Sequence, residues 1–277
     1  DPIFFPGGNI GDLAVNGTVN DIAMSEATPL YLSAGLIIEE GFSTADFEKI
    51  IAAMAEAARN AGVAIVAGDT KVVPHGAADK LFINTAGIGL IPEGVNISGA
   101  NARPGDKIIL SGTMADHGVA ILKQREGLTF DAPIQSDSAP LNHMVERMLS
   151  ICRDIHVLRD PTRGGVGTTL SEIAGQSNAG IKITESCLPV KAPVAGLCDL
   201  LGLDPLYVAN EGKLIAVVEA SHAGRVLSAI KEDPSGKDAC IIGEVVSDHA
   251  GVVVLETLVG GERIVDMLTG EQLPRIC

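Results

Sequence analysis

Strand-like and helix-like segments follow one another irregularly along this chain, and this order is the strongest constraint on its fold. A helix-like segment at 43–61, with apolar residues on one face, precedes a short apolar run at 63–67 that predicts a buried strand. Two further strand patterns, at 81–91 and 107–112, follow with no helical pattern between them. Because this order departs from strict βαβ alternation, we predict two α+β domains.

The chain is also too long for one ordinary core. Its 277 residues suit two domains of about 100–170 residues each. We place the first domain at 1–100, the second at 101–265 and a flexible tail at 266–277. With no Trp and 3% aromatic residues, the cores must be built from Ala, Val, Ile and Leu.

Charge and cysteine usage exclude several classes of protein. A net charge of −15 argues against binding to nucleic acids or anionic membranes, which reward clustered Lys and Arg. The five cysteines are odd in number and lack CxxC spacing, which indicates a reducing, cytoplasmic compartment with the four internal thiols buried. No apolar run approaches the ~18 residues of a membrane span. Because the chain starts at Asp1 without Met, we expect it to be a fragment that lacks its true N-terminus.

Three aspartates stand beside small residues at turns or element ends. Asp12 and Asp21 bracket a predicted loop-to-helix element, and Asp69 belongs to a Gly-Asp-Thr-Lys sequence after the predicted buried strand at 63–67. Carboxylates presented in this way suit Mg²⁺, which is usually shared with nucleotide phosphates. Any one of them could instead be a helix cap or a turn residue. The three together favour a metal site.

A glycine-rich turn, Asp160-Pro-Thr-Arg-Gly-Gly-Val-Gly, precedes a predicted helix. Gly164 and Gly165 would let the backbone approach a ligand, and amides at a helix N-terminus favour phosphate oxygens. The turn matches neither GxxxxGK[ST] nor GxGxxG, so neither common nucleotide-binding fold is implied. A purely structural helix start is an equal alternative.

Two further charged residues are candidates for catalysis. Lys71 could neutralise phosphate charge or act as a base, although a solvent-facing lysine in a strand is an equal alternative. Glu211 stands between Asn210 and Gly212 just before an apolar strand, where it faces either a cleft or a plain turn. His75, His117 and His143 are widely spaced and match no metal-ligand or triad pattern, and we expect structural roles for them, with His117 the nearest to an exception.

The chain ends in Pro-Arg-Ile-Cys, which places the thiol of Cys277 beside the terminal carboxylate. Such a tail is either a frayed end or a tethered carrier thiol that visits more than one active site. It is not a prenylation signal, because that requires Cys four residues from the end.

Taken in order, six sequences resemble the HypE family of hydrogenase maturation proteins. They are NGTVNDIAMSEATPLYLS, VAGDTKVV, RPGDKIILSG with ADHG, RDPTRGGV, NEGKL and terminal PRIC. The family belongs to the PurM-like fold group of aminoimidazole ribonucleotide synthetase and selenophosphate synthetase, so a two-domain α+β fold with a truncated N-terminal domain is implied. The resemblance spans essentially the whole chain. Glu26 stands where the family commonly has Gly.

The resemblance implies an ATP-dependent dehydratase that converts a carbamoyl group on Cys277 into a thiocyanate, the source of the cyanide ligands of NiFe hydrogenase iron. Lys71 and Glu211 become catalytic residues, with Cys277 as the modified carrier. The residues implied for ATP are Asn20, Asp21, Asp69, Thr70, Asp160, Gly164 and Gly165, and those implied for Mg²⁺ are Asp12, Asp21 and Asp69. The implied partners are the carbamoyltransferase HypF, the iron-carrying HypC–HypD complex and a second copy of the chain.

This activity gives the residues a chemical purpose. An amide oxygen is a poor leaving group until phosphorylation by ATP turns it into phosphate. A base must then remove the nitrogen's protons, which typically contributes 10²–10⁴-fold. We assign Glu211 as the base and Lys71 to the phosphorylated oxygen, and the two roles could be exchanged.

Two alternatives remain, as does one expectation about ATP. The chain could be a kinase or synthetase of the same fold group that acts on a free small molecule, or a catalytically inactive scaffold. The glycine-rich segment that covers the phosphates in this group would precede Asp1, so we expect weak ATP binding or none from this chain.

Overall fold

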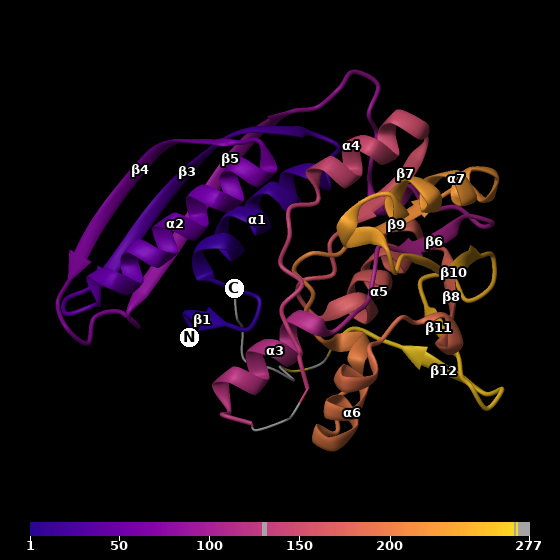
Figure 1. The fold of residues 1–277 in the computed structure, drawn as a ribbon. Helices are drawn as coiled ribbons and strands as arrows, with labels where there is room; N and C mark the ends of the chain where they lie inside the picture. Colours follow the sequence, from indigo (N-terminus) through magenta and orange to yellow (C-terminus); the bar gives the residue numbers. More distant parts are fainter. Residues whose placement is uncertain (129–131, 269, 271–277) are drawn as a thin grey trace.

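The computed structural model describes residues 1–128, 132–268 and 270. Two α+β domains lie beside each other, with the N-terminal domain in indigo and purple (Figure 1). The first contains β1 (Phe4–Phe5), β2 (Gly8–Asn9), α1 (Ile10–Ala23), β3 (Thr28–Glu39), α2 (Thr44–Ala61), β4 (Ala64–Val73) and β5 (Leu81–Leu90). The second contains β6 (Lys107–Leu110), α3 (Asp116–Arg125), α4 (Asn142–Ile151), β7 (Ile155–Arg159), α5 (Gly165–Ser177), β8 (Gly180–Thr184), α6 (Ala192–Leu201), β9 (Ile215–Val218), α7 (Ala220–Lys231), β10 (Cys240–Val246), β11 (Val253–Glu256) and β12 (Glu262–Val265).

The N-terminal domain is a three-stranded sheet in the order β4-β3-β5, with β3 parallel to β4 and antiparallel to β5. Helices α1 and α2 cover one face, where Val19 and Met54 join Leu32 in the core. On the other face, which we call the outer face, the cross-strand pairs Tyr31–Ile88 and Ile37–Phe82 are exposed. No described residue covers these apolar side chains.

Strand β4 corrects one expectation. The run at 63–67 was predicted to be a buried strand that ends before Gly68. Instead, β4 continues to Val73 and nearly all of it is exposed. Apolar composition alone cannot distinguish a strand that its own chain covers from an edge strand that is left uncovered.

Helix α1 corrects a second expectation from the sequence. It was predicted only for the later half of 9–24, with Asp12 on a loop. The helix begins at Ile10, because Asn9 and Asp12 form a capping box. The Asn9 side chain accepts from the backbone N–H of Gly11, and the Asp12 carboxylate accepts from the N–H of Asn9.

The C-terminal domain is a seven-stranded sheet in the order β12-β11-β8-β10-β6-β9-β7. Its pairs are antiparallel except for β8 with β11. Helix α5 packs on one face, where Leu170 meets Ile108, and α4 and α7 pack on the other, where Met148 and Val226 meet Ile109. The cores are built mainly from Ala, Val, Ile and Leu, as the composition predicts, and methionines such as Met148 add to them.

The cysteine prediction was partly wrong. Cys152 and Cys198 are buried, but Cys187 is exposed and Cys240 is half-buried. None of the described helices combines the length and apolar character needed to cross a membrane.

Glu26 has an unusual environment. Its φ of +56° lies in the left-handed region that favours glycine. The side chain is buried, its Oε1 has no hydrogen-bond partner among the described residues, and burial raises the pKa of the carboxyl group to about 7. It lines a cavity of about 270 Å³ between the start of β3, residues 92–95 and α4.

Candidate active site

A cleft of about 980 Å³ lies between the two domains. Helix α1 and strand β5 supply the N-terminal wall, including Asp21 and Thr85. Asp160, Arg163 and Glu211 supply the C-terminal wall. The fold therefore brings together carboxylates that are separated by up to 190 residues in sequence.

Three carboxylates meet in this cleft. Asp21 lies in the last turn of α1, Asp160 follows β7, and Glu211 precedes β9. The pKa of Asp21 is raised by burial and by the charge of Asp160, while Arg163 opposes the shift. Clustered negative charge of this kind is relieved by a bound cation.

Glu211 is the most perturbed of the three. Its side chain is almost fully buried, and burial raises the pKa of the carboxyl group to about 8. The charges of Asp137, Asp160 and Asp21 add to this shift, and Arg163 opposes it. A carboxyl group poised near neutral pH in a cleft suits proton transfer.

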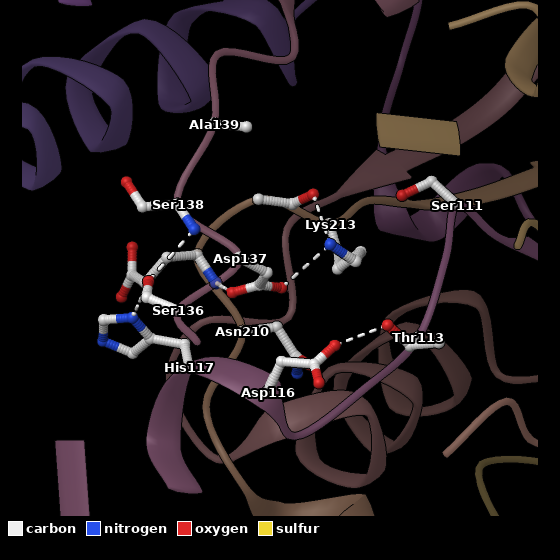
Figure 2. Close-up of polar contacts among 12 residues, drawn as sticks. Ser111, Thr113, Asp116, His117, Ser136, Asp137, Ser138, Ala139, Asn210 and Lys213 are labelled. Carbon is white, nitrogen blue, oxygen red and sulfur yellow. Dashed lines mark hydrogen bonds and ion pairs between the residues drawn. The ribbon is translucent and has the colours of Figure 1, made fainter. Parts of the chain in front are cut away.

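Asp137 fixes the backbone of Glu211 through a hydrogen bond. Its Oδ1 accepts a hydrogen bond from the Glu211 N–H at 3.0 Å, and its Oδ2 pairs with Lys213 Nζ at 3.1 Å (Figure 2). Lys213 also donates to the carbonyl of Gly212 at 3.2 Å. The side chains of Asp137 and Lys213 are both buried, so each charge depends on the other for neutralisation.

Asn20 lies behind the cleft wall rather than in it. Its amide donates to the carbonyls of Ala139 and Glu211, at 3.1 and 3.0 Å, and its Oδ1 accepts from the N–H of Leu141 at 2.8 Å. With donors and acceptor occupied and 1% exposure, this side chain joins α1 to the second domain.

Residues 136–139 contact both domains. The Ser136 N–H donates to the carbonyl of Pro6, and the Ser136 hydroxyl bonds His117 Nδ1 at 2.8 Å. The Ser138 hydroxyl donates to Asp12 at 3.2 Å. The sequence marked His117 as the nearest exception to a structural role; the side chain is buried against Phe5, and burial lowers its pKa to about 4, so the ring is neutral.

The two glycines of the predicted phosphate turn begin α5. Gly164 and Gly165 have φ of +70° and +63°, and a Cβ on Gly165 would lie 2.5 Å from the Leu206 carbonyl oxygen. Packing alone thus requires glycine at position 165. Thr162 and Arg163, directly before them, line the cleft.

Besides Asn20, Gly164 and Gly165, four more of the described predicted residues do not line the cleft in a single chain. Asp12 caps α1, while Asp69, Thr70 and Lys71 lie on β4. By register, Lys71 pairs with Ile37 and Asp69 with Gly35, which places both on the outer face. Thr70 N–H donates to the Asp69 carboxylate at 2.8 Å. Cys277 lies outside the described residues.

Sequence reasoning missed Arg163, Asp137 and Lys213. Arg163 was visible as the residue before the two glycines. Asp137 carries no local signal, because its partner Glu211 is 74 residues away.

Comparison with known proteins identifies the chain's relatives. Residues 1–91 match the model of the AIR synthase related protein N-terminal domain, and residues 103–256 match that of its C-terminal domain. The carbamoyl dehydratase HypE of Azotobacter vinelandii is 57% identical over 276 residues, which span 100% of this chain and 81% of the relative. The chain belongs to the HypE family. This confirms the resemblance, the enzyme class and the PurM-like α+β fold predicted from the sequence.

Solved HypE structures agree with this assignment. A HypE crystal structure in complex with ATP is 56% identical, with a TM-score of 0.96, and the match covers 100% of this chain and 84% of that one. A HypE–HypF complex contains a chain that is 53% identical, with a TM-score of 0.94 and coverages of 97% and 87%.

Proposed function

We propose that this chain uses ATP to dehydrate an S-carbamoyl group on Cys277 to a thiocyanate, which supplies cyanide ligands for NiFe hydrogenase iron. The HypE relatives named carbamoyl dehydratases support the reaction. The observation that carries the mechanism is the buried carboxyl group of Glu211 at the wall of the interdomain cleft.

The reaction balances through phosphate. The carbamoyl oxygen attacks the γ-phosphorus, ADP leaves, and the nitrogen gives up its first proton. Loss of the second N–H proton then forms the C≡N bond as inorganic phosphate departs with the former amide oxygen. Glu211 accepts one of these two protons. Burial favours the neutral carboxyl group that this transfer produces.

The cleft suits Mg²⁺ and phosphate chemistry. Asp21 and Asp160 offer hard carboxylate oxygens in a region of clustered negative charge. Arg163 and the α5 N-terminus offer positive charge and N–H groups for phosphate oxygens. Bound Mg²⁺ would neutralise phosphate charge during transfer.

A homodimer accounts for the placement of Asp69 and Lys71. The exposed apolar pairs on the outer face form a surface that a second copy would cover. We place Asp69 and Lys71 of one subunit at the cleft of its partner, where Lys71 stabilises the phosphorylated oxygen. The sheet would then serve both association and catalysis.

The reaction requires a donor and an acceptor for the carrier group. We assign loading of Cys277 to HypF, since a HypE–HypF complex has been solved. An iron-carrying HypC–HypD complex then receives the cyanide, in the cytoplasm, where ATP is available.

Intact-mass spectrometry tests the proposal. Full-length protein carbamoylated at Cys277 and given Mg-ATP should lose the mass of one water, whereas the Glu211→Gln variant of the same protein should retain ATP binding and the carbamoyl mass. If the Glu211→Gln variant dehydrated the carbamoyl group at the wild-type rate, Glu211 would not be needed as the base, and the mechanism would be overturned.

A further inference from the structure

A second group of potential ligands lies in the C-terminal domain and shares no residue with the interdomain cleft. Asp154 lies between α4 and β7, and Glu219 and His222 lie at the start of α7. One carboxylate oxygen from each acid and one ring nitrogen of His222 all lie within 4.8 Å of one another. Three side chains from two separate segments therefore converge on one point.

In the part of the chain that the structure describes, the two carboxylates of this group lack a fixed cationic partner. Within the described ranges, neither Asp154 nor Glu219 pairs with a lysine or an arginine. Asp154 Oδ1 lies 3.6 Å from His156 Nε2, and a Glu219 oxygen accepts from the Ser221 hydroxyl at 2.7 Å. Two neighbouring negative charges without such a partner attract a cation.

A buried histidine independently points to a ligand here. His156 is 6% exposed, and its Nδ1 bonds the Asp106 carboxylate at 2.7 Å. Its Nε2 is buried without a hydrogen-bond partner among the described residues and lies 3.6 Å from the Asp154 carboxylate. The ring of His222 has an outer contact too, since Cys152 Sγ lies 3.3 Å from its Nδ1. Protein metal ligands are commonly oriented by such outer contacts.

We propose that Asp154, Glu219 and His222 bind one divalent transition-metal ion of the Zn²⁺ class. A nitrogen donor combined with two carboxylates favours Zn²⁺, Co²⁺ or Ni²⁺ over Mg²⁺, which selects oxygen ligands. Three protein ligands leave positions for water or for a partner's side chain. The ion would join the α4–β7 connection to α7.

Calorimetric titration of tag-free, chelator-treated full-length protein with Zn²⁺ tests this site. Excess Mg²⁺ is included so that the carboxylates of the cleft are already occupied. We expect one Zn²⁺ per chain at the site. His222→Ala and Asp154→Asn should each weaken that binding by at least about tenfold, and His156→Gln should weaken it by a similar factor through Asp154. His249→Ala, which removes an exposed histidine of the same domain, should leave it unchanged.

A second readout uses Co²⁺ as the probe. Its visible absorption should appear on binding to the wild-type protein and be lost in His222→Ala, while circular dichroism shows that the variant is folded. If His222→Ala and Asp154→Asn both bound the metal as tightly as the wild-type protein does, the metal would be assigned to thiols such as Cys187, and the proposal would be overturned. Absence of Zn²⁺ binding to the wild-type protein would overturn it as well.

Discussion

The backbone N–H of Glu211 donates a hydrogen bond of 3.0 Å to the carboxylate of Asp137, and this carboxylate is itself buried. This contact fixes the start of the segment that carries the Glu211 side chain. The negative charge of Asp137 also raises the pKa of Glu211, second only to burial. One residue thus affects both the position and the protonation of the proposed base.

The pH dependence of dehydration should follow Glu211. Because the base is active when deprotonated, the rate should rise with pH through about 8, the pKa of Glu211. Asp137→Asn removes a negative charge and should move this limb to lower pH. A pH–rate profile measures the shift, with the exposed Asp238→Asn as control. An unchanged limb in Asp137→Asn would contradict this electrostatic role.

Mixed dimers should reveal shared sites. Lys71→Ala and Glu211→Gln should each be inactive alone. If each site combines Lys71 of one subunit with Glu211 of its partner, a random mixture should regain about a quarter of wild-type activity, since half the dimers carry one intact site of two. Co-expression of differently tagged chains provides the sample. A mixture that stays inactive would place each site within one chain.

Asn20→Ala should destabilise the protein by about 3 kcal/mol, because it leaves buried carbonyls and an N–H without partners. Urea unfolding measures the loss. Asn60→Ala, an exposed asparagine in α2, should change the free energy of unfolding by less than about 0.5 kcal/mol. A stable Asn20→Ala variant that fails only to bind ATP would instead support the ligand role implied by the family resemblance.

Glu26→Gly should stabilise the fold, and more so at high pH. Glycine removes the strain of holding a side chain in the left-handed backbone region, which should stabilise the fold by about 1 kcal/mol. The folded pKa of about 7 exceeds the ordinary value of 4.5, so ionisation costs wild-type stability as pH rises from 4.5 to 7, and the whole cost is present above 7. The gain should therefore be about 1–3 kcal/mol larger near pH 8 than near pH 5.

Glu26→Gln separates the two contributions to that gain. It keeps the side chain and the left-handed backbone but cannot ionise, so it should remove only the pH-dependent part. Urea unfolding of the three proteins at both pH values provides the comparison. Equal gains for Glu26→Gly at both values would show that ionisation of Glu26 does not limit stability.

Local patterns predicted much of the fold and part of the site. Motif order led to the two-domain architecture, and Asp21, Asp160 and Glu211 do line one cleft. Asp12 shows where a local signal was read incompletely, because Asn9 three residues before it already matches a capping box.

Other features depend on contacts that no local pattern contains. The exposure of β4 follows from its place at the edge of a sheet whose outer face no described residue covers. The contact between Asp137 and Glu211 joins segments that only the fold brings together. The convergence of Asp154 with Glu219 and His222 has the same cause. Spacing along the chain reveals helices and caps, but it does not reveal which loops meet.

Residues 136–139 touch the N-terminal turn, α1, α3 and the backbone of Glu211 within four positions. Both walls of the cleft are therefore positioned from a single short peptide. The length of this peptide therefore sets the distance between the two walls of the cleft. An insertion or deletion there would displace opposite walls together, so we expect this stretch to tolerate changes of length poorly.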